Sequence, residues 1–178
     1  MADAAMESMR PLLTEEQIQE RVAELAAQIT QDYLGRKLLL IGVLKGCFVF
    51  LADLARKIDG DLSIDFVQVS SYGTSRQSSG IVQILLDTGI NIEGRNVIIV
   101  EDIEDSGLTL KHLRELLSVR KPKSLRVCAL LSKMKARGQE SQLDYVGFEI
   151  PDEFVVGYGL DYAERYRSLP YIAVIAND

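Results

Sequence analysis

Helical segments alternate with short apolar segments along this chain, and that alternation limits the folds open to it. Residues 37–44 and 97–100 carry almost only aliphatic side chains, the pattern of strands buried on both faces of a parallel sheet. Residues 14–33 instead repeat aliphatic side chains at helical spacing, behind a capping box of Thr14 and Gln17. Further segments follow: helical ones at 47–58 and 107–117, and strand-like ones at 61–72, 81–87, 124–133, 143–151, 154–161 and 171–175. Helices interleaved with strands predict an open, largely parallel α/β sheet with right-handed crossovers.

The composition fits a single compact domain spanning residues 1–178. With 178 residues, 47% of them apolar, the chain can bury a sizeable core. A net charge of -6 argues against broad affinity for nucleic acid or for anionic membranes. Residues 1–13 lack the apolar core of a secretory signal, and the apolar runs are too short to span a bilayer. Cys47 and Cys128 show no metal-ligand spacing, so we expect two reduced core thiols in a cytoplasmic protein.

The segment "VIIVEDIEDSGLTL", residues 97–110, joins an apolar strand to a helix through a turn of unusual charge. Ser106, Gly107 and Thr109 suit a turn whose backbone N–H groups bind a phosphate at a helix N-terminus. Yet four carboxylates belong to the same turn, at positions 101, 102, 104 and 105. Such acids alone also suit a solvated loop or a simple divalent-metal site. A ligand with a phosphate, hydroxyl groups and a metal-bound diphosphate would use both the turn and the acids.

Other strand ends matter because ligands of open α/β sheets bind beyond the carboxyl ends of the strands. Leu44, Lys45 and Gly46 end the first apolar strand, and Lys133 ends a later one. The patterns of a P-loop and of a dinucleotide fingerprint are both absent, so neither nucleoside triphosphate hydrolysis nor hydride transfer is favoured. The sequence therefore combines a phosphate-binding turn, clustered acids and separated cations at the predicted ligand edge.

The segment at 97–110 resembles the phosphoribosyl-diphosphate signature of type I phosphoribosyltransferases: apolar strand, two acids, two residues, then Asp-Ser/Thr-Gly-x-Thr. "LKG" at 44–46, "SSYG" at 70–73 and the run at 146–175 further resemble the hypoxanthine-guanine branch of that family. The resemblance implies an open, mostly parallel twisted sheet flanked by helices, with a small hood built from terminal segments. It also implies transfer of phosphoribosyl from 5-phosphoribosyl 1-diphosphate to hypoxanthine or guanine, with Mg²⁺ as cofactor. Members of the family are homodimers or homotetramers.

The resemblance assigns roles to the central motif. The 5-phosphate is expected on the backbone and hydroxyl groups that start at Asp105 and continue through Ser106, Gly107, Leu108 and Thr109. Glu101 and Asp102 are expected to address the ribose hydroxyls and to share a Mg²⁺, and Asp161 matches a ligand of a second Mg²⁺. Asp105 is expected to accept the proton of the purine N7 atom. Glu104 departs from the apolar residue common at its position, and strand alternation predicts that it points away from the ligand.

The resemblance also assigns a purine site. Lys133 matches the lysine that donates to the purine 6-oxygen, Phe154 matches the aromatic ring that stacks on the base, and the Val155 backbone matches the position that reads the base edge. Two departures from the family pattern accompany these matches. Met134 stands where many relatives have arginine, and Glu153 replaces a lysine found in some.

A pyrophosphate site is implied in the same way. The Leu44–Lys45 peptide is expected to be cis, which aims an N–H group at pyrophosphate beside Gly46, and Arg167 matches the residue that grips pyrophosphate. The polar loop that begins at Ser71 and Tyr72 matches a lid that closes over the diphosphate and excludes water. By composition alone, a plain linker loop is equally consistent.

Two other classes of protein stay open at this point. A regulatory relative that binds RNA would need a basic face and would have no need for Asp105. The acidic charge balance and the intact carboxylate both count against it. A receiver-like phosphoacceptor module would leave the C-terminal run unexplained. Without the resemblance, Lys45, Arg167 and Phe154 would be a turn lysine, a surface arginine and a core aromatic. His112 lies opposite the apolar face of its helix, so we expect it to be solvent-exposed rather than a catalytic base.

Overall fold

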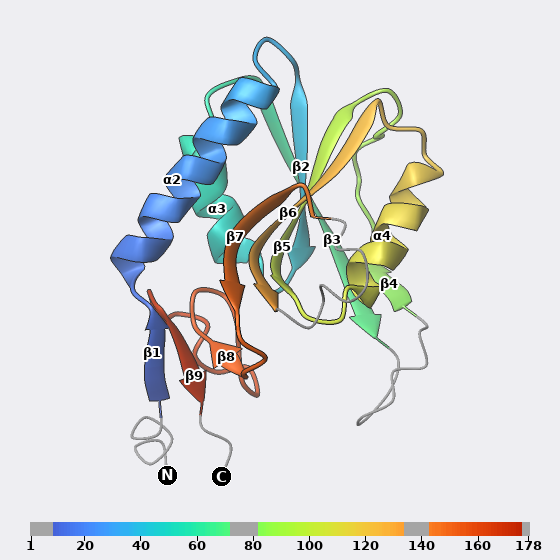
Figure 1. Ribbon diagram of the computed structural model, residues 1–178. Coiled ribbons are helices and arrows are strands. Elements are labelled where there is room, and N and C mark those ends of the chain that lie inside the picture. Colours follow the sequence, from blue (N-terminus) through green and yellow to red (C-terminus); the bar gives the residue numbers. More distant parts are fainter. Residues whose placement is uncertain (1–8, 72–81, 134–142, 176–178) are drawn as a thin grey trace.

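Two β-sheets form the framework of the protein (Figure 1). The computed structural model describes residues 9–71, 82–133 and 143–175. A six-stranded sheet has the order β4-β3-β2-β5-β6-β7, and a three-stranded sheet has the order β1-β9-β8. The strands are β1 (Met9–Leu13), β2 (Leu38–Leu44), β3 (Leu62–Ser71), β4 (Val82–Leu86), β5 (Asn96–Glu104), β6 (Ser124–Lys133), β7 (Tyr145–Ile150), β8 (Val155–Val156) and β9 (Ile172–Ile175). The helices are α2 (Glu15–Asp32), α3 (Phe48–Lys57) and α4 (Leu108–Ser118).

The predicted open, mostly parallel sheet is confirmed. β2 pairs in parallel with β3 and with β5, and β5, β6 and β7 continue the parallel run. Only β4, at one edge of this sheet, runs antiparallel to its neighbour β3. The chain therefore builds outward from β2 to β4, then crosses back to β5 on the other side of β2. This reversal of strand order marks β2 and β5 as the switch point where such sheets bind ligands.

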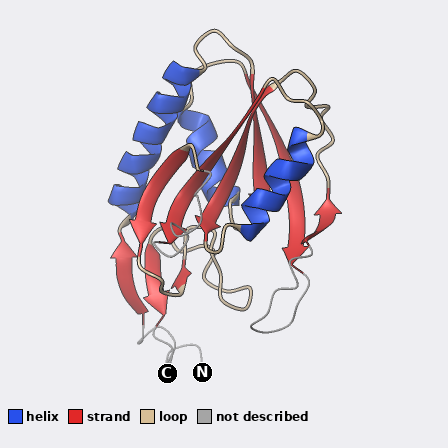
Figure 2. Cartoon of the chain, turned by 45° about the vertical axis from the view of Figure 1, so that its right-hand side comes forward, coloured by secondary structure: helices blue, strands red, loops and turns tan. Residues whose placement is uncertain are grey.

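Helices cover both faces of the central sheet, with α2 and α3 on one face and α4 on the other (Figures 1 and 2). The capping box of Thr14 and Gln17 is present at the start of α2, as predicted. Helix α2 buries one apolar stripe against the sheet and α3: Ile18, Val22, Leu25, Ala26 and Ile29. Each large aliphatic side chain buried in this way contributes about 1.5–3 kcal/mol. The buried stripe of α2 thereby forms part of the core on one face of the central sheet.

The three-stranded sheet forms the predicted hood and joins both ends of the described chain. β1 pairs antiparallel with β9, and β9 pairs antiparallel with β8. The sequence did not indicate β1 as a strand, because Pro11 weakens the strand pattern; the proline is accommodated at the outer edge of this sheet. Glu153, one of the two departures from the family pattern, accepts hydrogen bonds from Arg10 of β1 at 2.9 and 3.0 Å. Glu153 therefore lies on the surface of the hood, where it pairs with Arg10.

Two further sequence predictions concern the cysteines and membrane association. Cys47 and Cys128 are free, buried thiols as predicted, and burial raises the pKa of both, that of Cys128 to about 12. Within the described residues, no helix combines the length and apolar character that a membrane crossing requires.

Candidate active site

The carboxyl ends of β2, β5 and β6 lie side by side, because these strands are adjacent and parallel. Their arrowheads point toward the end of the molecule that carries the hood (Figure 1). One boundary differs from the prediction: β5 continues to Glu104, so Glu101 and Asp102 are strand residues and only Asp105 begins the turn. The pairing of β5 with β6 explains the extension, since Glu104 still has a ladder partner in Ser132.

The carboxylate of Asp102 lies directly against the backbone of Gly46 at this edge of the sheet. A Cβ atom added to Gly46 would lie 1.7 Å from Oδ2 of Asp102, so the position accepts only glycine unless the carboxylate moves. The Leu44–Lys45 peptide bond directly before it is cis, as predicted. The turn after β2 and the acids of β5 therefore form one continuous surface across the switch point.

Glu101 is buried beside this surface, with 7% of its area exposed. Burial, and next the negative charge of Asp102, raise the pKa of Glu101 well above its usual value. A divalent cation would favour the charged form of both carboxylates. Among residues 9–71, 82–133 and 143–175, no three His, Cys, Asp or Glu side chains gather as a ready-made metal site. The donor set fits Mg²⁺ bound through one or two carboxylates, with the remaining oxygens supplied by substrate and water.

The turn after β5 leads directly into α4 and suits an anion. Gly107 precedes the helix in the left-handed region, with φ of 73°, a conformation that glycine adopts without strain. Ser106 Oγ accepts a hydrogen bond of 3.5 Å from the N–H of Leu108, while the other N–H groups of a first helical turn lack intrahelical partners. Thr109 lies within that first turn. Backbone donors, the positive end of the helix dipole and two hydroxyl residues thus lie within the same short turn.

Glu104 takes a different direction from its neighbours. Its residue is only 4% exposed, and its Oε2 atom accepts a hydrogen bond of 3.0 Å from Ser132 Oγ of β6. The structure therefore directs this carboxylate into the interior, away from the open edge, in line with strand alternation.

Lys133 and Asp105 meet across the ends of β6 and β5. Lys133 Nζ lies 3.0 Å from Asp105 Oδ2 and 3.5 Å from Asp152 Oδ1. The lysine side chain is 10% exposed, whereas the aspartate side chain is 66% exposed. An ammonium group held in a largely buried position presents donors to one side of the site, and an accessible carboxylate presents acceptors beside it.

The aromatic residue predicted to stack on a base is accessible. Phe154 is 42% exposed, so it is not a core side chain, and its ring meets that of Tyr162 edge to face at 5.7 Å between centroids. Val155 is buried in β8, where it pairs with Val174 of β9. The hood thereby supports an exposed aromatic face next to the strand ends.

Arg167 is tied to its own loop by three contacts. Its guanidinium donates to the Gly159 carbonyl at 2.7 Å and lies 2.8 Å from Asp161 Oδ1 and 3.5 Å from Glu164 Oε2. The same Glu164 lies 3.2 Å from Lys45 Nζ, and this lysine lowers the pKa of Glu164. Sequence reasoning missed Glu164, because nothing in its spacing links it to a lysine 119 positions away. Lys45, Asp161 and Arg167 are thus brought together, although each was predicted separately.

Some predicted residues are not covered in full. Ser71 is the last residue of β3, while Tyr72 and the rest of the predicted lid, and likewise Met134, lie outside the described residues. His112 was predicted to be exposed and is instead half-buried. It follows Leu110 by two positions and precedes Leu113, so it flanks the buried stripe of α4 rather than opposing it.

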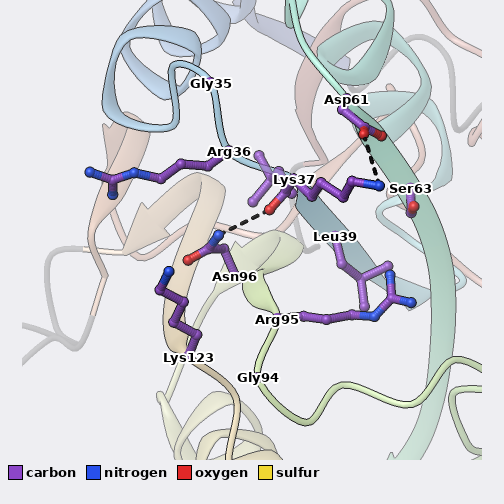
Figure 3. Close-up of a pocket in the computed structure, with 11 residues that line it drawn as sticks. Gly35, Arg36, Lys37, Leu39, Asp61, Ser63, Gly94, Arg95, Asn96 and Lys123 are labelled. Atoms are coloured by element: carbon purple, nitrogen blue, oxygen red, sulfur yellow. Dashed lines mark hydrogen bonds and ion pairs between the residues drawn. The ribbon is translucent and has the colours of Figure 1, made fainter.

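A separate hollow of about 600 Å³ lies at the opposite end of the central sheet, where the strands begin. Its lining includes Arg36, Lys37, Arg95 and Lys123, but none of the predicted site residues. Figure 3 shows the Arg36 and Arg95 side chains pointing in different directions, and Lys37 directed toward Asp61 at 3.4 Å. The cations therefore do not converge on one point, and the predicted chemistry belongs to the other end of the sheet.

Comparison with known proteins agrees with this geometry. The family model of the phosphoribosyl transferase domain matches residues 11–163. The hypoxanthine-guanine phosphoribosyltransferase of Bacillus subtilis is 54% identical over 164 residues, which cover 92% of this chain and 91% of that protein.

Solved structures of such enzymes also resemble this chain in fold and sequence. A crystal structure of a hypoxanthine-guanine phosphoribosyltransferase from Bacillus anthracis has a TM-score of 0.89 at 52% identity, covering 94% of this chain and 98% of that one. The hypoxanthine phosphoribosyl transferase of Trypanosoma cruzi has a TM-score of 0.87 at 44% identity, covering 94% and 91%. The family model and these relatives show that the chain belongs to the phosphoribosyltransferase family, in the hypoxanthine-guanine branch.

Proposed function

We propose that this protein transfers the phosphoribosyl group of 5-phosphoribosyl 1-diphosphate to hypoxanthine or guanine and releases pyrophosphate, a reaction of purine salvage. The observation that carries the proposal is the pair of Lys133 and Asp105, with 3.0 Å between Nζ and Oδ2, beside the phosphate-binding turn. A donor-only ammonium suits the 6-oxygen of these bases, and a carboxylate next to it suits a proton of the same ring system. Sequence identity above 50% with the hypoxanthine-guanine phosphoribosyltransferase of Bacillus subtilis supports the same function.

The chemical step needs a proton acceptor, and Asp105 is in position to supply it. As the new glycosidic bond forms, the purine becomes more acidic and its N7 proton must leave. Asp105 accepts that proton at a carboxylate oxygen, while Lys133 holds the 6-oxygen and so fixes the base. The accessible negative charge of Asp105 also favours an electron-poor ribosyl centre in the transition state. Phe154 and the Val155 backbone hold the purine ring and its edge.

The sugar substrate is proposed to lie along the ends of β5 and α4. Its 5-phosphate binds the N–H groups and hydroxyls of the turn at 105–109. Glu101 and Asp102 accept hydrogen bonds from the ribose hydroxyls and would hold a Mg²⁺; Asp161 would hold a second. The cation supplies charge neutralisation on the leaving diphosphate. Arg167, the Lys45 N–H group and Gly46 bind the pyrophosphate end.

Three wider properties belong to the same proposal. The loop at Ser71 and Tyr72, which lies largely outside the described residues, keeps its predicted role of excluding water, because an activated ribosyl centre left wet would hydrolyse. The protein acts in the cytoplasm on small molecules and without nucleic-acid or membrane partners. It assembles as a homodimer or homotetramer, and structural work on the T. cruzi relative likewise concerned oligomeric state.

One assay tests the proposed function against the alternatives. Pyrophosphate release is measured with hypoxanthine, guanine, xanthine and adenine, in the presence of Mg²⁺ and again in EDTA. We expect release with hypoxanthine or guanine, essentially none with adenine, and loss of release in EDTA. An RNA-binding regulator or a phosphoacceptor module would give no base-dependent pyrophosphate at all, and activity in EDTA would remove Mg²⁺ from the proposal.

A further inference from the structure

The carboxylate of Glu164 lies between two cations that come from distant parts of the chain. Lys45 Nζ is 3.2 Å from both of its oxygens, and Arg167 contributes a longer contact of 3.5 Å. Lys45 follows β2, whereas Glu164 belongs to the loop after β8. The acid thus spans the space that separates the turn after β2 from the C-terminal loop.

The backbone holds Glu164 at this place. Its N–H group donates to Asp161 Oδ2 at 2.8 Å, and both Ala163 and Glu164 adopt positive φ, of 50° and 63°. On the other side of the same space, a Cβ on Gly159 would lie 2.1 Å from the Gly46 carbonyl, so the loop and the turn after β2 are in direct contact. The fold therefore fixes the backbone of Glu164, and so places its carboxylate within reach of Lys45 and Arg167.

The contacts of Glu164 are those of an anion ligand, and they are easily given up. Its side chain is 66% exposed and that of Lys45 is 56% exposed, whereas Arg167 is 20% exposed and keeps two further acceptors, the Gly159 carbonyl and Asp161. An exposed pair of this kind changes an equilibrium constant by only about 1.4- to 5-fold. Glu164 can therefore leave without stripping Arg167 of its partners.

We propose that Glu164 is an internal anion that occupies the pyrophosphate position of the ligand-free protein and competes with pyrophosphate for Lys45 and Arg167. The inference rests on the proposed pyrophosphate role of Arg167 and of the Lys45 backbone N–H group, and it adds the Lys45 ammonium to that site. When the diphosphate end of the substrate binds, the carboxylate swings into solvent and the phosphate oxygens replace it. When pyrophosphate leaves, the carboxylate returns, so the cations do not face each other without a counter-charge. Glu164 thereby weakens pyrophosphate binding and favours its release.

The test compares pyrophosphate binding to the full chain by titration calorimetry, in EDTA and in Mg²⁺. Glu164→Gln keeps the size of the side chain and removes its charge, so the dissociation constant in EDTA should fall about 2- to 25-fold, the combined effect of two exposed pairs. Glu24→Gln is the matched control, because it removes an exposed acid that pairs with Arg21 on α2. It should bind like wild type. High salt should shrink the difference between Glu164→Gln and wild type.

A second pair of variants separates the inference from the proposed function. Lys45→Met should weaken pyrophosphate binding, and in Lys45→Met/Glu164→Gln the gain from the glutamine should be smaller than in the single variant. If Lys45→Met binds pyrophosphate as wild type does, the Lys45 ammonium takes no part in the site and the inference is wrong, while the proposed roles of the Lys45 N–H group and Arg167 are unaffected. If Lys45→Met weakens binding but Glu164→Gln does not tighten it, the site stands and the competing role of Glu164 is wrong. If Glu164→Gln weakens pyrophosphate binding in Mg²⁺ but not in EDTA, Glu164 is a metal ligand and the inference is likewise wrong.

Discussion

Nζ of Lys133 lies 3.0 Å from Oδ2 of Asp105, so the residue proposed to read the base and the residue proposed to accept its proton contact each other. The pair joins the end of β6 to the residue that follows β5. A 6-oxo group that takes a hydrogen bond from Lys133 would draw the ammonium away from the carboxylate. The correct base would therefore release its own proton acceptor, which couples recognition of the 6-position to chemistry.

Removal of Lys133 should change base preference. Wild type should use hypoxanthine and essentially reject adenine, because an ammonium group facing the 6-amino group meets donor with donor, and such mismatches reject substrates by about 10⁴. Lys133→Ala should cut hypoxanthine use sharply and narrow the gap to adenine, whereas Lys123→Ala, at the far end of the sheet, should change nothing. The measurement is kcat/KM for both bases. Wild-type use of adenine within about tenfold of hypoxanthine would refute the 6-oxopurine assignment.

Removal of the basicity of Asp105 should slow turnover without loss of substrate binding. Asp105→Asn keeps the shape of the side chain, so the turn at 105–109 should still bind the sugar phosphate. Turnover should fall by about 10²–10⁴, the usual effect of losing a general base. Steady-state kinetics gives the rate, and calorimetry gives the dissociation constant of phosphoribosyl diphosphate. A variant with near-normal turnover would exclude Asp105 as the proton acceptor.

A methyl group on Gly46 should disturb the site through Asp102. Gly46→Ala places Cβ 1.7 Å from Oδ2 of that carboxylate, so either the acid or the turn after β2 must move. A displacement on the order of 1 Å costs about 10² in rate, so kcat/KM for phosphoribosyl diphosphate should fall by that factor. Gly89→Ala is the control, since no heavy atom lies within 4 Å of its added Cβ. Equal kinetics for the two variants would contradict the predicted crowding.

The buried carboxylate of Asp53 should make folding stability depend on acid pH. It accepts hydrogen bonds from Gln19 of α2 at 2.7 Å and from the Tyr158 hydroxyl at 2.6 Å, and it pairs with Arg56. Burial works to raise its pKa, but these hydrogen bonds outweigh burial and lower the pKa below the usual 3.8. Because the folded pKa lies below the unfolded one, this stabilisation is present above pH 3.8 and is lost as the pH falls through the folded pKa.

Asp53→Asn should therefore lower the free energy of unfolding at neutral pH by about 1–3 kcal/mol, since an amide nitrogen would face the donors of Gln19 or Arg56. The difference from wild type should shrink as the pH falls below 3.8, where the wild-type carboxyl also becomes protonated. Urea unfolding across this pH range measures both quantities. A difference that persists unchanged into acid would show that shape, not charge, sets the contribution of Asp53.

The central sheet was predictable because its strands are buried on both faces, which demands unbroken aliphatic runs such as Leu38–Leu44. The carboxyl-end rule then brought distant motifs to one edge. The strand β1 was not predictable, because an edge position tolerates Pro11 and asks little of the other residues. His112 was misjudged for a related reason: a helical face predicts which side is buried better than how far the burial extends.

Within the site, residue types were predictable and their pairings were not. The motif at 97–110 identifies a phosphate-binding turn with acids, since backbone geometry and charge act over a few neighbouring residues. Contacts such as Gly46 with Asp102, or Lys45 with Glu164, depend on how the turn after β2 packs against other segments. The spacing of residues along the sequence does not indicate that packing.

The hood pairs strands that are synthesised early and late in translation. β1 is complete by Leu13, yet its partner β9 begins only at Ile172, and Val155 of β8 pairs with Val174 of the same late strand. Residues 38–150 contain all six strands of the central sheet, so all of these strands are synthesised before β9. The hood is therefore the last part of the framework to pair, because β1 and β8 both require β9.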